Sequence, residues 1–437
     1  MKEGFSKLNK SEKIDWVINN FFNSSKTDSE LLKKYWSNDD ELQKIHDEFS
    51  ENTISNFFLP LGIAPNFIID KNNYTIPMAT EESSVVAAAC KSAKFWAKRG
   101  GFKTEIIDLI KTGQVHFKYD GSKEKIFKFF KQIKKRLISD CSEITKNMKE
   151  RGGGILDIEL IDKTNDIENY YQICSRFNTV DSMGANFINS CLEQYAKTFE
   201  TEFLNSKFFE KDEKLEIIMS ILSNYVPECL VRAEVRCKVD ELKNKDIQDP
   251  KIFAQKFVDA IKIAKNDIGR AVTHNKGIMN GIDSVVIATG NDFRAVEACA
   301  HAYASKNGNY SSLSHARVQK DEFVFWMEIP LAVGTVGGIT NLHPLVKWSL
   351  KLLKKPSASD LMRIIVVAGL AQNFAALRSL ITSGIQLGHM KMHLINILNS
   401  LDADNSEKKT LVEYFKKHKV SFRKAEKALT KLRRNEL

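Results

Sequence analysis

Apolar residues recur at helical spacing in several stretches of the chain. Residues 1–60 are polar, and Ile14, Val17 and Phe21 belong to a first apolar face. In residues 122–138 apolar positions again recur every three or four residues, with lysines between them. Residues 418–437 have the same period and a basic polar side. This spacing predicts amphipathic helices whose apolar faces pack and whose charged faces stay in solvent.

A different pattern on either side of the basic helix predicts strands. Residues 114–119, QVHFKY, and residues 150–161, ERGGGILDIELI, have strand character. A further helix is expected to begin near Asp181, with Asp181 or Ser182 as its N-cap. Strands and helices mixed in this way predict a small α+β unit set inside a larger, mainly helical domain.

The segment 273–292 gathers polar residues and glycines around one short apolar run. Residues 285–288, VVIA, are mostly β-branched and bounded by glycines, which predicts a buried strand. Lys276 is then expected in or beside a turn before this strand. Asp292 follows it and, like Asn291, could cap a helix over 293–304. The simple interpretation is that Lys276 is an exposed cation in a loop and Asp292 an ordinary helix cap. The number of glycines around Lys276 instead favours a reaction centre.

Two adjacent carboxylates, Glu81 and Glu82, precede Ser83, Ser84 and a run of small residues. Acidic residues in a first helical turn complement the helix dipole, so capping is the interpretation that the residues alone favour. A carboxylate partly buried beside a close-packed helix would have a raised pKa and could donate a proton. Both interpretations stay open at this point.

Composition limits the classes of protein to consider. The chain has 437 residues, 43% of them hydrophobic, which is enough for a sizeable core and two or three domains. The longest apolar run, residues 364–371, is much shorter than the ~20 residues of a membrane-spanning helix, and the N-terminus lacks an apolar leader. We therefore expect a cytoplasmic protein without a membrane anchor. The 7 cysteines include no CxxC pair, which argues against a disulfide framework and a thiolate zinc site.

The net charge of +10 makes nucleic acid a partner to consider. The basic stretches lack the exposed aromatic residues and glycines of single-strand binders. Solvated helix faces or an anionic small-molecule ligand explain the charge better. We therefore expect no nucleic-acid partner.

Histidines near the C-terminus are candidates for proton transfer. His389 follows Gly384 and Gly388, and His393 lies four residues later. Without a third ligand motif this pair predicts no metal site. A histidine in a flexible segment, with an ordinary pKa of ~6.5, is better suited to moving protons.

Six segments stand out when the chain is taken in order: EESSVVAAA, RGGGILDIEL, DSMGANFINS, GRAVTHNKGIMNGIDSVVIATGNDFRAVEACAHAYA, VGTVGGITNLHP and GLAQNFAALRSLITSGIQLGHMKMH. Together they resemble the class II (bacterial and archaeal type) 3-hydroxy-3-methylglutaryl-CoA reductases. The resemblance covers roughly residues 50 to 430. Ser182 and Ser83 depart from it, since the family commonly has alanine and proline at these positions.

The resemblance implies reduction of 3-hydroxy-3-methylglutaryl-CoA to mevalonate and CoA by two nicotinamide cofactors. Lys276 would stabilise the oxyanion that hydride attack creates. Glu82 would supply a proton, and Asp292 would contact Lys276 and tune the proton positions of the network. His389 would protonate the departing CoA thiolate.

Binding residues also follow from the resemblance. Arg270 would pair with the free carboxylate of the substrate. NADPH is expected over NADH because Thr145 and Lys146 stand where an acidic residue would accept from the ribose 2′-hydroxyl. No metal is expected. The further substrate positions are Ser84, Asn224, Asn280 and Gln372, and the further cofactor positions are Asp181, Met183, Gly184 and Asn186.

The implied architecture is α+β. It has a large, mainly helical domain in two segments (1–108 and 219–383) with a central strand region, a small inserted ferredoxin-like cofactor domain (109–218) and a helical C-terminal flap (384–437). It also implies a homodimer with shared active sites, and a hexamer of dimers is the larger assembly considered. Two rival functions are retained: another acyl-CoA and nicotinamide-dependent oxidoreductase, or a basic non-catalytic nucleic-acid-binding protein. The sequence indicates neither the physiological direction nor a role for residues 1–50.

Overall fold

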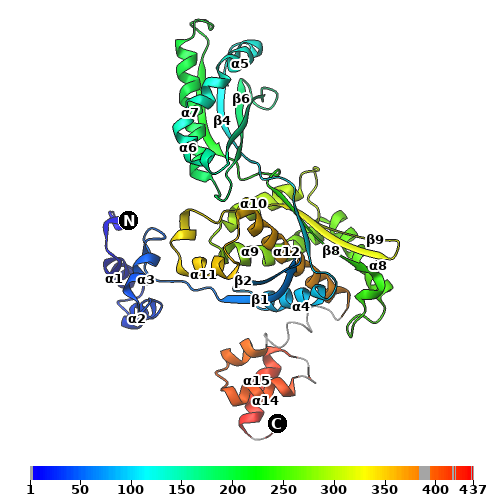
Figure 1. The fold of residues 1–437 in the computed structure, drawn as a ribbon. Helices are drawn as coiled ribbons and strands as arrows, with labels where there is room; N and C mark the ends of the chain where they lie inside the picture. The colour runs from blue at the N-terminus through cyan, green and yellow to red at the C-terminus, as the bar shows by residue number, and fades with distance from the viewer. Residues whose placement is uncertain (1–2, 383–393, 416–417, 419, 435, 437) are drawn as a thin grey trace.

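The computed structural model describes residues 3–382, 394–415, 418, 420–434 and 436. Figure 1 shows a large central body with a small α+β domain at one end and helices of both chain termini outside it. The mixture of helices and several small sheets agrees with the predicted α+β class.

The N-terminal residues form short helices, as their apolar spacing predicts. Each of the three α-helices begins at a side chain that accepts a hydrogen bond from a first-turn backbone N–H, and Asn9 and Glu12 form a reciprocal capping box. Ile14 and Ile18 are buried. The elements are η1 (Phe5–Lys7), α1 (Lys10–Phe21), α2 (Lys26–Lys34) and α3 (Asp40–Asp47).

The large domain combines an antiparallel sheet, a separate hairpin and a group of helices. The hairpin is β1 (Leu61–Ile69) with β2 (Asn72–Ala79). The sheet contains β3 (Lys103–Ile106), β8 (Leu230–Lys238), β10 (Glu322–Pro330) and β9 (Ser314–Gln319), in this spatial order. The helical elements are α4 (Val85–Ala97), η2 (Val239–Leu242), α8 (Pro250–Asn266), α9 (Ile268–Ala288), α10 (Phe293–Ala304), η3 (Gly338–Asn341), α11 (Pro344–Leu352) and α12 (Ala358–Ile381).

The core of this domain is built around α12. Among the described residues it is the helix long and apolar enough to cross a membrane, but 72% of that window is buried inside the protein, and it packs against α9, α4 and β8. Burial on nearly all sides explains its apolar composition without a lipid environment. Close approach to α9 depends on Gly281, where an added Cβ would lie 2.5 Å from the carbonyl oxygen of Ala368.

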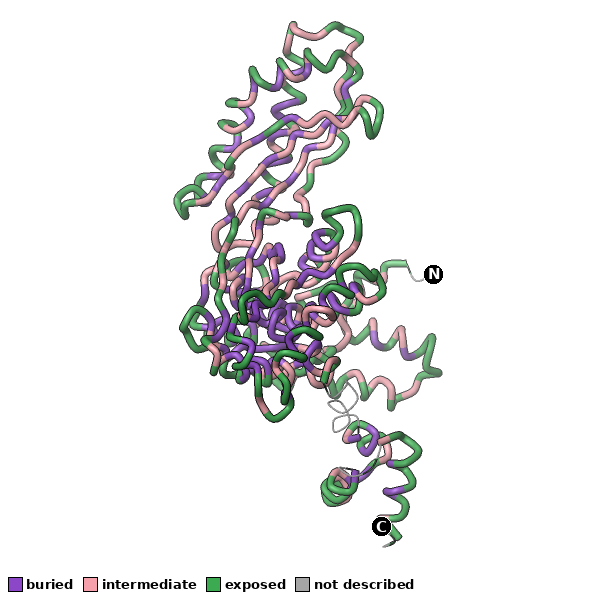
Figure 2. The backbone as a smooth tube through the Cα atoms, turned by 90° about the vertical axis from the view of Figure 1, so that its right-hand side faces the viewer, coloured by how far each residue is buried: buried purple, intermediate pink, exposed green. Residues whose placement is uncertain are grey.

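The small domain is a four-stranded antiparallel sheet with helices packed on it. Its order, β5-β6-β4-β7, and its sequence of strands and helices match the expected ferredoxin-like arrangement. Figure 2 shows the buried residues of this domain running along its strands and its helices. Phe117, Phe129 and Phe199 pack together in its core. The elements are β4 (Lys111–Tyr119), α5 (Lys123–Ser139), α6 (Ser142–Glu150), β5 (Gly154–Asp162), β6 (Tyr170–Asn178), α7 (Ala185–Asn205) and β7 (Leu215–Leu222).

The described C-terminal residues form a separate helical cluster. Residues 394–400 are helical and are followed by α14 (Asn405–Tyr414) and α15 (Phe422–Arg433). Leu398, Leu411 and Leu429 are buried in a small core of their own. The basic helix expected over 418–437 is confirmed for the part that α15 covers.

Three local predictions were wrong: one strand and the starts of two helices. The strand expected at 285–288 is the last turn of α9, because β-branched residues buried on all sides fit a core helix as well as a strand. Lys276 therefore lies in mid-helix and not at a turn. Gly184 replaces Asp181 or Ser182 as the N-cap of α7. Glu81 and Glu82 precede α4 and are not in its first turn. The boundary expected at 218 falls inside β7, which pairs with β4.

Candidate active site

Lys276 and Glu82, 194 positions apart in the chain, form an ion pair. The ammonium Nζ donates to Glu82 Oε2. Lys276 projects from the solvent side of α9, and Glu82 lies in the loop between β2 and α4, two elements that both pack against α9. The two side chains are 61% and 40% exposed, so a ligand can reach both charges.

Buried polar side chains fix the opposite face of α9. His274 Nε2 lies 2.7 Å from Ser314 Oγ, which donates to Asn373 Oδ1 at 2.8 Å. Burial lowers the pKa of His274 to about 3, so the ring is neutral at physiological pH. Asn275 bonds the backbone at both Ser311 (2.9 Å) and Leu313 (3.1 Å). These contacts set the rotation of the helix and thereby the direction of Lys276. The sequence indicates these buried contacts only by the polar pair His274 and Asn275 immediately before Lys276, and the sequence analysis did not identify them.

Ser84 is the N-cap of α4 but does not cap it with its side chain. Its φ is 76°, in the left-handed region, and its hydroxyl makes no capping hydrogen bond. Such strain in a non-glycine residue is often found at functional sites. The helix α4 begins three residues after Glu82, and the N–H groups at its open N-terminus favour an anionic or carbonyl group.

The other expected substrate residues lie on α9, on α12 and between the domains. Asn280 is half-buried one turn after Lys276, on the same side of α9. Burial lowers the pKa of Arg270, and no carboxylate within the described residues forms an ion pair with its guanidinium. Gln372 packs against Gly281, and its buried Oε1 has no hydrogen-bond partner. Asn224 lines a cleft between the two domains.

Asp292 lies at the start of α10, away from Lys276 along the chain direction of α9. Its Oδ1 accepts from the backbone N–H of Arg294 (3.0 Å) and Ala295 (3.2 Å) and pairs with the Arg294 guanidinium at 3.2 Å. No ion pair joins it to Lys276 in the part of the chain that the structure describes. The continuation of α9 beyond Lys276 for 12 residues, about 18 Å, explains the separation. His389 and His393 lie outside the described residues.

An acidic pair occupies the same side of α9 as Lys276, two turns further along. Asp283 on α9 lies close to Glu297 on α10, and its buried Oδ1 has no hydrogen-bond partner. Burial and the neighbouring Glu297 carboxylate together raise the pKa of Asp283 to about 8. Sequence reasoning missed this pair because only the packing of α9 against α10 brings the two residues together.

The expected cofactor segment, residues 181–186, forms a tight turn that leads into α7. Asp181 Oδ1 accepts from the Ala358 N–H at 2.7 Å, which joins the turn to the start of α12. Gly184 has φ 90°, and a Cβ there would lie 2.4 Å from Thr179 Cγ2. The 21-residue α7 has no side-chain cap. Its free N–H groups and dipole therefore suit the phosphates of a dinucleotide.

The remaining cofactor residues differ in how accessible they are. Met183 lines the cleft between the domains, and Asn186 is exposed in the first turn of α7. Lys146 is exposed on α6. Thr145 is fully buried, and its hydroxyl donates to the Ser142 carbonyl at 3.2 Å. Lys146 is therefore the better placed of the two to meet a ligand. No group of three or more His, Cys, Asp or Glu side chains that could hold a metal occurs in the described ranges.

Comparisons with known proteins agree on one family. The family model described as hydroxymethylglutaryl-coenzyme A reductase matches residues 11–394. A 3-hydroxy-3-methylglutaryl-coenzyme A reductase of Archaeoglobus fulgidus is 37% identical over 89% of this chain and 86% of its own length. A probable reductase of the same name from Borreliella burgdorferi is 34% identical over 88% and 86%.

Solved structures extend the agreement to the fold. The 3-hydroxy-3-methylglutaryl-coenzyme A reductase of Streptococcus pneumoniae aligns over 98% of this chain and 99% of its own, with a TM-score of 0.72 and 34% identity. A structure of the class II enzyme from the same organism, bound to NADPH in open conformations, aligns over 87% and 99%, with a TM-score of 0.71. By sequence and by fold, this chain belongs to the hydroxymethylglutaryl-coenzyme A reductase family.

Proposed function

We propose that this protein reduces 3-hydroxy-3-methylglutaryl-CoA to mevalonate and CoA, with two hydrides supplied by two molecules of NADPH. The observation that carries the proposal is the accessible Lys276–Glu82 pair on a helix whose other face is fixed by buried polar contacts. Membership of the reductase family supports the reaction type.

Lys276 acts on the oxygen where charge develops. Hydride addition converts the thioester carbonyl into an alkoxide, and a fixed ammonium stabilises that charge more than it stabilises the neutral carbonyl. The reduced dinucleotide, when bound, supplies the hydride. Lys276 then holds the same oxygen while the C–S bond breaks and an aldehyde forms.

Glu82 supplies the proton for the second reduction. Reduction of the aldehyde places a second hydride on the same carbon, and the resulting alkoxide takes a proton to become the mevalonate hydroxyl. The contact between the carboxyl group and Lys276 puts the donor beside that oxygen. His389 is proposed to protonate the CoA thiolate, and Asp292 to tune the network once the active assembly has formed.

Substrate and cofactor are assigned to neighbouring surfaces. The guanidinium of Arg270, which forms no ion pair with any described residue, suits the carboxylate of the substrate. Ser84, Asn280, Gln372 and Asn224 supply further polar contacts. The open N-terminus of α7 suits the dinucleotide phosphates, and the exposed Lys146 favours a 2′-phosphate. A ratio of kcat/KM for NADPH over NADH well above one is expected, and a strong NADH bias would contradict this assignment.

We propose that two subunits pair to complete each active site. Large apolar side chains are exposed in the segments assigned to the large domain, with Phe57 94% exposed and Ile268, the first residue of α9, 66% exposed. Exposed apolar side chains that form one patch are typical of an interface. Light scattering coupled to size exclusion should give the mass of a dimer or, for a hexamer of dimers, twelve times the subunit mass. A monomer at micromolar concentration would contradict shared sites.

The four-part division expected at 1–108, 109–218, 219–383 and 384–437 is proposed as the functional organisation, except that the whole of β7 (Leu215–Leu222) belongs to the second part. The last part is proposed to close over the site as a flap. Closing such a flap expels water and brings a proton donor to the reacting sulfur. A cytoplasmic location without membrane or nucleic-acid partners is proposed with it. Truncation after Gly384 should abolish thioester reduction and spare much of mevaldehyde reduction, while equal loss of both would contradict this role.

One assay tests the proposal against its rivals. Purified protein is mixed with NADPH and 3-hydroxy-3-methylglutaryl-CoA, and nicotinamide absorbance and released thiol are followed together. We expect two NADPH oxidised for each thiol released. Oxidation only with a different acyl-CoA would indicate another oxidoreductase on this fold. No turnover together with salt-dependent nucleic-acid binding would indicate the non-catalytic rival.

A further inference from the structure

A second lysine, Lys111, occupies the junction between the two domains. The chain enters the small domain between β3 and β4 and leaves it between β7 and β8. The two crossings are joined by backbone hydrogen bonds from Ile107 N–H to the Leu230 carbonyl (2.9 Å) and from Leu230 N–H to the Asp108 carbonyl (3.0 Å). Lys111 is the first residue of β4 and is only 5% exposed.

The ammonium of Lys111 is buried without a carboxylate partner. Its Nζ donates to Thr179 Oγ1 at 2.6 Å and to the Ser182 carbonyl at 2.8 Å. No ion pair to Lys111 is found in the ranges that the structure describes, and burial lowers its pKa. A buried cation is costly to the fold unless polar groups compensate it. Packing alone therefore does not explain why a lysine occupies this buried position.

Both acceptors belong to the turn that ends at α7. The Thr179 hydroxyl also donates to the Ser182 carbonyl at 2.7 Å, so Lys111, Thr179 and Ser182 form a closed triangle of hydrogen bonds. The methyl group of Thr179 lies directly under Gly184, the N-cap residue. Lys111 therefore controls the shape of the turn that sets where the first N–H groups of α7 point.

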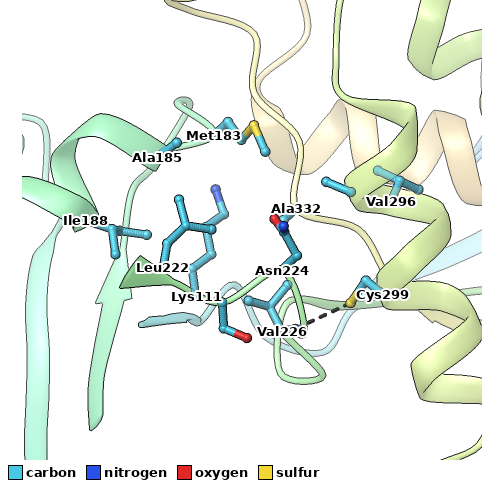
Figure 3. A pocket seen from close by; sticks show the side chains of 12 residues that line it. Lys111, Met183, Ala185, Ile188, Leu222, Asn224, Val226, Val296, Cys299 and Ala332 are labelled. Atoms are coloured by element: carbon cyan, nitrogen blue, oxygen red, sulfur yellow. Dashed lines mark hydrogen bonds between the residues drawn. The ribbon is translucent and has the colours of Figure 1, made fainter. Parts of the chain in front are cut away.

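Lys111 also lines a cleft shared by the two domains. Figure 3 shows its side chain beside those of Leu222 and Met183, with Ala332, Val296 and Cys299 on the facing side. The free volume is about 20 Å³, enough for about one water molecule. The ammonium thus adds positive potential close to the uncapped N-terminus of α7, where the helix dipole has the same sign. Together these two features favour an anion in front of α7.

We propose that Lys111 is a positioning residue for dinucleotide binding: by holding Thr179 and the Ser182 carbonyl it presents the N-terminus of α7 to the diphosphate of the cofactor. The inference rests on the proposed function and deepens it at the cofactor site. Lys111 does not touch the ligand directly. Its effect should therefore fall on cofactor affinity and leave the thioester substrate unaffected.

Lys111→Met, which keeps the length of the side chain and removes its charge, tests the inference. We expect the dissociation constant of NADPH, followed by its fluorescence without substrate, to rise about tenfold, as for loss of a charged hydrogen bond. KM for NADPH should rise in parallel, while KM for 3-hydroxy-3-methylglutaryl-CoA stays within about twofold of wild type. Lys118→Met, at an exposed position of the same strand, is the matched control and should change neither.

Thr179→Val provides a second variant if Lys111→Met does not fold. It removes one acceptor of Lys111 at nearly constant shape and should weaken NADPH binding in the same direction. In the double variant the increase in the NADPH dissociation constant should be smaller than the product of the two single increases. Both substitutions disrupt the same set of hydrogen bonds among Lys111, Thr179 and Ser182. Unchanged NADPH affinity, or an equal rise of both KM values, would overturn the inference. Wild-type protein that binds NADPH but does not reduce the thioester would instead contradict the proposed function alone.

Discussion

The two lysines described above occupy opposite kinds of environment. The side chain of Lys276 is 61% exposed and paired with a carboxylate, whereas Lys111 is 5% exposed and, among the described residues, bonded only to a hydroxyl and a carbonyl. An exposed ammonium can meet a substrate oxygen directly, but a buried one acts only through the groups that it holds. We infer that the position of a cation in the fold, and not its residue type, decides whether it can contact a ligand or only position other groups. Substitutions at the two sites should therefore change different measurements.

Lys276→Ala should have the largest effect. We expect kcat for thioester reduction to fall by about 10²–10³ or more, because the charge that stabilises the alkoxide is lost. The melting temperature should change little, since the side chain is largely exposed. Calorimetry alongside the NADPH assay separates the two effects. Near-normal turnover of Lys276→Ala would show that Lys276 does not act on the substrate, and would contradict the difference in role proposed for Lys276 and Lys111.

Glu82→Gln should have the next largest effect. The amide keeps the shape but supplies no proton, so we expect kcat for reduction of mevaldehyde to fall about 10²-fold. Glu81→Gln, at the adjacent and more exposed position, is the control and should retain most activity. If the two variants lose activity equally, the ion pair with Lys276 does not identify the proton donor.

Two glycines one turn apart on α9, Gly277 and Gly281, test whether the helix that carries Lys276 depends on close packing for its stability. Gly281→Ala should destabilise the fold by about 1–3 kcal/mol, because its Cβ would lie 2.5 Å from the Ala368 carbonyl oxygen. Gly277→Ala meets no atom within 4 Å and should stabilise it by about 0.5–1 kcal/mol through helix propensity. Urea unfolding of both variants measures the difference. Equal effects would mean that α9 does not depend on close contact with α12.

The last prediction concerns the pH dependence of stability at Asp283. Its pKa is raised from 3.8 to about 8 in the folded chain, so the folded state holds a proton that the unfolded state releases. Wild-type stability should therefore fall as pH rises from about 4 to about 8. Asp283→Asn removes this loss, and its melting temperature relative to wild type should increase across that window and level off above it. A constant difference between pH 4 and pH 9 would show that Asp283 does not hold the proton.

The sequence alone determined the family, the α+β class and the main amphipathic elements. The order of the segments around Lys276, Asp181 and the C-terminal glycines carries the resemblance. The spacing of Ile126, Phe129 and Ile133 defined α5, because a solvated helix must alternate its faces every three to four residues. These features depend on residues that are close together in the sequence, so a single stretch of chain is enough to identify each of them.

Only the tertiary structure decided how the polar residues are used. A short β-branched run bounded by glycines does not distinguish a buried strand from a buried helix, and packing against α12 made residues 285–288 part of α9. Packing of α9 against β2 and α4 placed Lys276 beside Glu82, and packing of α9 against α10 placed Asp283 beside Glu297. Asp292 caps α10. Lys111 gave no signal in the sequence because its acceptors lie 68 and 71 residues away. Contacts between distant residues depend on the whole fold, so local pattern cannot specify them.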